Sequence, residues 1–306
     1  MISAGRLLKS TELRADESIQ SLAIRLAPFC LTSVDEFLRY GLGMNTKLSS
    51  LPSDVRALER LAEIGGFDAE EVQRRTVKWT STGYLLYGRK IPHHWVSTNT
   101  RRLAPGVLFN DDLIPFHRLA WQVNALECDV ETGEALVGQC PRCCATLTWN
   151  NIEGIAVCGT CRFDLRKHQP RYVPDAQLEF ARELHSYLLC TSACLPAPFD
   201  QADDITVCFA MEWFGSIADH RGDKALQPSC KSAAAGLAAI RAWPRSFEKV
   251  LRRCAANGSA PSGLDVGRII PFLVDAIEKA GTSFLRHILL ERATKILGER
   301  LFLSAS

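Results

Sequence analysis

The residues best suited to chemistry in this sequence are two Cys-x-x-Cys pairs, Cys140–Cys143 and Cys158–Cys161, with 14 residues between them. This spacing is typical of a four-thiolate zinc site, because each short turn directs two sulfur atoms at one ion. Zn²⁺ accepts a tetrahedron of thiolates at about 2.3 Å. Because Cys140, Cys143, Cys158 and Cys161 fill all four positions, no position is open for catalysis. We therefore expect one structural zinc per chain.

The residues between the two pairs favour a zinc ribbon. Residues 146–149 and 154–157 are rich in residues with high strand propensity, and residues 150–154 supply turn formers. We predict that these stretches pair as a hairpin that carries the second cysteine pair back to the first. Zinc binding contributes about 10–16 kcal/mol in peptide models, so the ribbon is expected to fold around its ion.

The sequence lacks the common signatures of enzymes. It has no Walker A sequence, no G-x-G-x-x-G, no H-E-x-x-H and no G-x-S-x-G. The zinc deaminase signature is also missing, since no His-x-Glu precedes the first cysteine pair. We predict that the protein is not an enzyme. An enzymatic rival, a nuclease or transferase with a structural ribbon, would require a divalent-metal-dependent activity that survives purification.

Composition places the chain among ordinary globular proteins. With 306 residues, 47% of them hydrophobic and 23% charged, it is expected to form two or three domains. A formal net charge of +2 means that any basic surface must be local. The N-terminus has no apolar core of a signal peptide, and no apolar run is long enough to span a membrane. We predict a cytoplasmic protein with reduced thiols and no membrane contact.

The elements around the cysteines predict a mainly α fold with a small β zinc ribbon. We expect a helical N-terminal domain over residues 1–76, a strand and loop region with the ribbon over 77–174, and a helical C-terminal domain over 175–306. The N-terminal helices include one after a capping box at residues 33–36 and one ending at residues 65–66. Helices of this kind fit either a helix-turn-helix reader or a plain helical bundle.

The C-terminal region contains one helix with a basic face. Pro244 suits the first position of this helix. One face is apolar and begins with Phe247, and the opposite face carries Arg245, Lys249, Arg252 and Arg253. Contact with nucleic-acid phosphates is the functional interpretation, and a solvated charged face is the structural one. Two further amphipathic helices are expected over residues 269–280 and 284–297.

Several stretches, taken together, resemble the TniQ/TnsD family of transposon target-selection proteins. Residues 16–27 resemble the family's opening "E-S-L-x-S-W-L-x-R-L-A" helix. Residues 116–143 are similar to its "R-L-x-W … C-P-x-H-G … L-L-x-x-C-P-x-C" order, and residues 243–247 are similar to its "W-P-x-x-F" element.

The chain departs from this family at an earlier zinc site. Members often carry C-P-x-C before the Arg-Leu-x-Trp stretch and C-P-x-H after it. Here the first pair reads Ala104-Pro105-Gly106-Val107, and the second reads as Cys128-Asp129-Val130-Glu131. In this alignment three of the four ligands are lost, which again predicts one zinc per chain.

The resemblance implies an adaptor without catalytic activity. Such proteins mark an insertion site by reading DNA directly or by docking onto a CRISPR RNA-guided effector complex, in which base pairing supplies the specificity. They then recruit an AAA+ ATPase, which brings in the transposase, and some act as homodimers. A rival from another class is a zinc-ribbon transcription regulator, which would bind a specific DNA sequence alone with a steep salt dependence.

Overall fold

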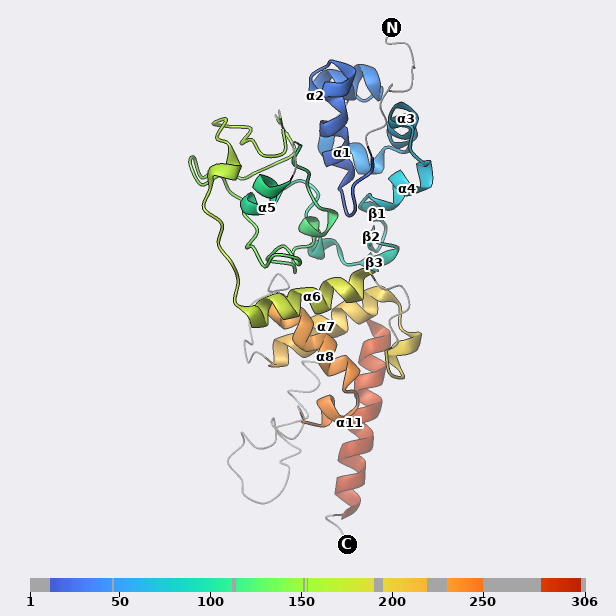
Figure 1. Ribbon diagram of the computed structural model, residues 1–306. Helices are drawn as coiled ribbons and strands as arrows, with labels where there is room; N and C mark the ends of the chain where they lie inside the picture. Colours follow the sequence, from blue (N-terminus) through green and yellow to red (C-terminus); the bar gives the residue numbers. More distant parts are fainter. Residues whose placement is uncertain are drawn as a thin grey trace. The chain divides into compact units, whose positions relative to one another are not determined.

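The computed structural model describes residues 12–45, 47–111, 114–150, 152, 154–189, 195–218, 230–249 and 282–303. The chain divides into two compact units between Thr191 and Ser192, and each unit is described on its own. Figure 1 shows the elements of both. The described residues are mainly helical, with a small three-stranded antiparallel sheet and a cluster of four cysteines. No helix among them is long and apolar enough to cross a membrane.

The first unit begins with short helices whose ends follow the sequence signals. Ser18 accepts a hydrogen bond from the Ser21 N–H at the start of α1, and Ser33 and Glu36 form the predicted capping box at α2. Gly66, at φ +68°, ends α3 in the left-handed conformation that glycine adopts readily. The elements are α1 (Ile19–Leu26), η1 (Ala27–Cys30), α2 (Val34–Glu36), η2 (Phe37–Gly41), η3 (Leu48–Ser53), α3 (Val55–Gly65) and α4 (Ala69–Arg74).

The charge at the start of α4 favours the plain helical bundle over the helix-turn-helix reader. In a helix-turn-helix, the N-terminal residues of the second helix reach the base edges. The first turn of α4 instead carries Glu70 and Glu71, whose carboxylates would repel phosphates.

A three-stranded sheet follows α4. Its strands are β1 (Lys78–Thr80), β2 (Gly83–Leu86) and β3 (Arg89–Ile91), paired antiparallel in the order β1-β2-β3. Tyr87 and Gly88 both have positive φ between β2 and β3, as a tight two-residue hairpin turn requires. The region after the sheet consists of short helices joined by loops, η4 (His93–Trp95), α5 (Pro105–Asn110), η5 (Leu119–Gln122) and η6 (Leu165–Lys167), and then α6 (Asp175–Leu189).

The N-terminal helices and the cysteine region share one hydrophobic core. It joins Leu22 and Leu61 to Trp121, Trp149 and Leu165, which lie far away in sequence. The predicted division at residue 76 therefore passes through a single core. Likewise, α6 belongs to the first unit, although the predicted C-terminal domain began at residue 175.

The second unit is built on two tightly packed helices, α7 (Asp204–Ala218) and α8 (Cys230–Arg241). A Cβ atom at Gly236 would lie 1.8 Å from the carbonyl oxygen of Met211, and one at Gly215 would lie 2.0 Å from that of Ser232. Reciprocal glycines thus let the two backbones touch. This unit also contains η7 (Phe199–Gln201) and α11 (Ser283–Leu303), which confirms the predicted last helix; the helix expected over residues 269–280 lies outside the described residues.

Aromatic rings fill the space beside α7 and α8. The residues of the "W-P-x-x-F" element, Trp243 and Phe247, stack with ring centroids 5.5 Å apart and an interplanar angle of 19°. Phe199, Trp213 and Phe214 contact them edge-on or tilted. This element therefore has a packing role in the second unit.

Candidate metal centre

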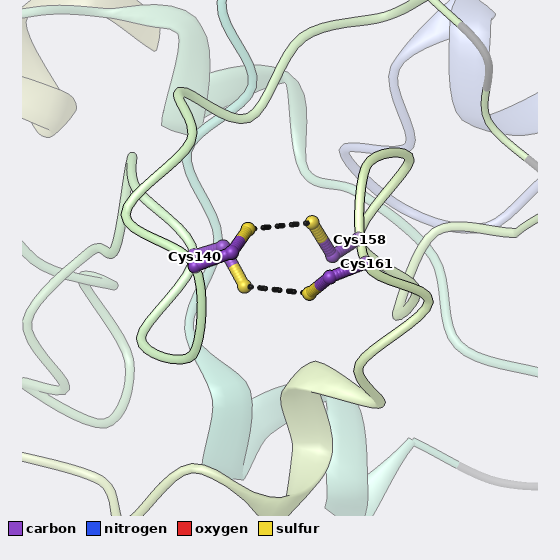
Figure 2. A group of neighbouring side chains, drawn as sticks. Cys140, Cys158 and Cys161 are labelled. Carbon is purple, nitrogen blue, oxygen red and sulfur yellow. Dashed lines mark hydrogen bonds between the residues drawn. The ribbon is translucent and has the colours of Figure 1, made fainter.

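Four cysteine sulfur atoms meet in the first unit. The Sγ atoms of Cys140, Cys143, Cys158 and Cys161 all lie within 4.8 Å of one another. The Cys140–Cys161 and Cys143–Cys158 pairs are 3.6 and 3.8 Å apart, and Figure 2 shows the sulfur atoms of the two loops facing one another. A disulfide would need about 2.05 Å, whereas thiolates at about 2.3 Å from one tetrahedral ion lie about 3.8 Å apart. The donor set therefore fits a closed metal site.

Each cysteine pair lies in its own loop, which we call a knuckle. In the first knuckle the Cys140 N–H donates to the Ala145 carbonyl at 2.9 Å, and the Cys144 N–H donates to the Cys140 carbonyl at 2.8 Å. The second knuckle repeats both bonds, from Cys158 to Phe163 and from Arg162 to Cys158, each at 3.0 Å. Cys144 and Arg162 take the same left-handed conformation, with φ of 58° and 59°.

The predicted hairpin between the two pairs is wrong. Strand bridges close each knuckle separately, between Gln139 and Thr146 and between Val157 and Asp164. Thr148, expected to pair within the ribbon, bridges to Thr100 instead. Local backbone bonds within each loop prevail over the strand propensity of the segment between them.

Backbone amides prepare the first thiol of each knuckle for a metal. Burial raises the pKa of Cys158, but the N–H groups of Thr160 and Cys161 and the neighbouring thiols outweigh this and lower it to about 6. The N–H groups of Arg142 and Cys143 donate to Cys140 in the same way, although burial keeps the pKa of that thiol raised. The knuckles thus supply N–H donors to the thiolates as well as the thiolates themselves.

A third knuckle with the same backbone carries no cysteine at the ligand positions. The Asp129 N–H donates to the Glu134 carbonyl and the Gly133 N–H donates to the Asp129 carbonyl, both at 2.8 Å, and Gly133 has φ +76°. The bridge between Cys128 and Ala135 occupies the equivalent place to those of the cysteine knuckles. Asp129 and Thr132 therefore stand where the two cysteines stand in the others.

This register corrects the sequence alignment, which had placed Cys128 and Glu131 at the ligand positions. The correct counterpart of the family's "C-P-x-H-G" is residues 129–133, and Gly133 is the signal that identifies it. Asp129 Oδ1 accepts hydrogen bonds from the N–H groups of Glu131 and Thr132, at 3.2 and 3.0 Å, and from the Thr132 hydroxyl at 2.9 Å. Hydrogen bonds thus close this knuckle without a metal, and all four ligands of the earlier site are replaced.

The other half of the earlier site has become a helix. Residues 104–107 form the start of α5, and Ala104 and Val107 are both buried. Glu134 of the third knuckle accepts hydrogen bonds from the N–H groups of Gly106 at 2.7 Å and Val107 at 2.9 Å. In the cysteine knuckles the equivalent N–H groups face the first thiol. A buried carboxylate therefore joins the third knuckle to the start of α5.

Residues of the opening helix and of the Arg-Leu-x-Trp stretch form one buried network. Glu17 and Arg25 pair with N–O distances of 2.7 and 3.0 Å, and the Ser21 hydroxyl donates to Glu17. The backbone N–H of His117 donates to the Ser21 hydroxyl at 2.9 Å. Burial, followed by the charge of Arg101, holds the pKa of His117 well below its ordinary value. A neutral, enclosed imidazole serves packing and hydrogen bonding here.

Residues 10–130 match the TniQ family model. The chain contains a TniQ domain. The matched residues include the whole buried network and end before the four cysteines. No curated protein matches the chain.

Two adjacent arginines, which the sequence analysis did not single out, hold loops together: Arg101 reaches beyond the TniQ domain, and Arg102 binds carbonyls within it. Arg101 is fully buried and donates to the carbonyls of Ile155 at 2.6 Å and Val157 at 3.0 Å, just before the second knuckle. Arg102 donates to the carbonyls of Trp121 and Leu126, both at 2.9 Å. Burial lowers the pKa of Arg101 to about 10, which leaves it charged at neutral pH, and negative charge on Cys158 offsets part of that effect. Two consecutive arginines in an extended stretch were the only sequence signal that could have indicated this role.

The proposed nucleic-acid residues lie outside the TniQ domain, in the second unit. Residues 245–249 are helical, with Phe247 fully buried and Arg245 and Lys249 exposed, as the sequence pattern predicts. Arg252 and Arg253 lie outside the described residues. The assignment of this face to phosphate contact stays a prediction.

Proposed function

We propose that this protein is a target-selection adaptor for transposition with no catalytic role. The observation that carries the proposal is the TniQ domain, which fits a transposition-associated protein. The adaptor would link a target-recognition module, either a CRISPR RNA-guided effector complex or DNA itself, to the AAA+ ATPase and transposase of the transposon. We also propose that this protein forms a homodimer.

We also propose that Cys140, Cys143, Cys158 and Cys161 hold one structural zinc. Tetrahedral sulfur sites suit Zn²⁺ or iron, and two knuckles with N–H donors to their thiolates are suited to a closed zinc site. The buried carboxylate contact in place of the earlier site supports a single ion. Metal analysis of the purified chain should give one zinc per chain, and two would overturn this part.

Affinity purification of the tagged protein from its own cells, with identification of both proteins and RNA, tests the adaptor role. An AAA+ ATPase with transposase is the expected result, and a guide RNA with its effector would assign the RNA-guided branch. Recovery of a specific DNA fragment without either transposition protein would favour the zinc-ribbon transcription regulator and overturn the adaptor proposal.

A further inference from the structure

One stretch of the TniQ domain is far more basic than the nearly neutral chain. No Asp or Glu occurs between Glu71 and Asp111, although the whole sequence balances 36 basic residues against 34 acidic ones. The stretch contains Arg74, Arg75, Lys78, Arg89, Lys90, Arg101 and Arg102 together with His93 and His94. Arg89 and Arg101 are buried, Arg74 and Lys90 are exposed, and the half-buried Lys78 donates a hydrogen bond to the Gln73 side chain at 2.9 Å.

The same stretch presents a group of aromatic rings at the surface. Trp79 on β1 has an exposed fraction of 62%, whereas Trp95, Trp121 and Trp149 are almost completely buried. Large exposed aromatic side chains call for an explanation, because their burial is so favourable.

The strand register and η4 bring three rings together, a group that we call the aromatic platform (Trp79, Tyr84 and His93). Trp79 pairs directly with Tyr84 across β1 and β2, so both side chains lie on one face of the sheet. The exposed His93 ring stacks beside Trp79, with centroids 6.0 Å apart and an interplanar angle of 26°. Tyr84 meets His93 edge-on at 4.9 Å and fixes the orientation of its ring.

We propose that the aromatic platform stacks an unpaired base of a single-stranded nucleic acid. Flat rings on a small sheet are suited to the face of a base that has left the duplex. Residues 72–110 carry cations and no carboxylate, so this stretch would attract a phosphate backbone, whereas carboxylates would repel it. The register places two of these cations, Lys78 and Lys90, on the face of the same small sheet opposite the platform. This charge pattern favours a nucleic acid over a protein as the occupant. This inference rests on the proposed function, in which the protein meets DNA or an RNA-guided complex.

Binding of a fluorescein-labelled oligonucleotide of about 12 nucleotides tests the platform. Oligouridine and oligothymidine distinguish RNA from DNA, a hybridised duplex tests the need for unpaired bases, and salt between about 50 and 200 mM tests phosphate contacts. Fluorescence anisotropy of the full chain should show tighter binding to the single strand. Trp79→Ala should weaken it about tenfold, as expected for the loss of one stacked base.

Two variants separate stacking from general effects. Trp79→Phe keeps a flat ring and should retain most of the affinity. Tyr40→Ala removes another aromatic side chain that is 60% exposed but lies close in sequence to Asp35 and Glu36, and it should bind like the unmodified chain. Unchanged oligonucleotide binding by Trp79→Ala would overturn the inference, as would equal weakening by Tyr40→Ala.

Co-purification of the transposition proteins with the same variants separates this inference from the adaptor proposal. If Trp79→Ala loses oligonucleotide binding and still recovers the ATPase, both stand. If it keeps oligonucleotide binding and loses the ATPase, the platform is a protein-docking surface and the inference fails while the adaptor proposal stands. Absence of the ATPase with the unmodified chain would count against the adaptor alone.

Discussion

The Glu134 carboxylate accepts a hydrogen bond at 2.7 Å from the backbone N–H of Gly106, at the start of α5. It accepts a second from Val107 and is itself almost fully buried. Through this contact the third knuckle is fastened to the helix that replaces a cysteine pair. Burial raises the pKa of Glu134, and the hydrogen bonds from the Gly106 and Val107 N–H groups offset part of that effect.

Replacement of Glu134 by Ala should lower the free energy of unfolding by about 1–3 kcal/mol, because two buried N–H groups lose their acceptor. Glu134→Gln retains one acceptor oxygen and should cost less. Chemical denaturation of the metal-loaded chain measures both. Glu131→Ala, at an exposed position of the same knuckle, is the control and should change stability by less than about 0.5 kcal/mol. Equal losses for Glu134→Ala and Glu131→Ala would contradict the fastening role.

The buried ion pair between Glu17 and Arg25 predicts a non-additive effect. Arg25→Met alone leaves the carboxylate buried without its cation and should destabilise the chain by about 3–5 kcal/mol. Adding Glu17→Gln removes the unpaired charge and should recover part of that loss. Denaturant midpoints of the single and double variants give the coupling, and Arg56→Met at an exposed position of α3 is the control. A double variant less stable than Arg25→Met would count against this pairing.

Gly236→Ala should destabilise the second unit, although alanine is preferred over glycine in helices by about 1 kcal/mol. The added methyl group would meet the Met211 carbonyl and force α7 and α8 apart. Thermal unfolding followed by circular dichroism measures the change. Ala238→Gly, at an exposed position of the same helix, gives the scale of the propensity effect alone. A Gly236→Ala chain as stable as the original would show that the two helices are not in backbone contact.

Metal retention should depend on pH in a direction set by the thiols. Backbone N–H donation lowers the pKa of Cys143, but burial and the neighbouring thiols outweigh it and raise that pKa to about 12, so metal binding must displace this proton. Affinity should therefore fall as pH falls, and most steeply below about pH 6, where Cys158 also becomes protonated. Zinc content after dialysis against a fixed chelator at each pH measures this.

A neighbouring cysteine provides the control for that measurement. Cys143→Ser should lose the metal at every pH. Cys144→Ser changes an exposed thiol that adjoins the site but is not among the four clustered sulfurs, and it should retain the metal like the original chain. Loss of metal from both variants to the same extent would mean that the ligand set is misassigned.

The clustering of the four cysteines could be predicted because sequence spacing alone determines how a Cys-x-x-Cys turn directs its sulfur atoms. The capping box at Ser33 and the buried position of Phe247 follow in the same way from local signals. The separate closure of the two knuckles could not be predicted from strand propensity, which is real at residues 146–149 but finds its partners elsewhere.

Longer-range relationships were beyond the reach of local patterns. The register of Asp129 and Thr132 depends on backbone hydrogen bonds, and only the glycine at position 133 hints at it. The contact between Glu134 and α5 joins residues that lie 27 and 28 positions apart, and no local sequence signal at either end specifies the other. The neighbours of His93 are the rings of Trp79 on β1 and Tyr84 on β2, and no local pattern around His93 specifies them.

The three knuckles share one backbone conformation, although only two of them carry cysteines at the ligand positions. A metal held by Cys140, Cys143, Cys158 and Cys161 would act as a cross-link between two separate loops. The carboxylate of Glu134 is a cross-link of another kind, which no chelator or oxidant can remove. Metal starvation or thiol oxidation would therefore loosen the link between the two cysteine loops, whereas the contact of Glu134 with α5 would stay in place.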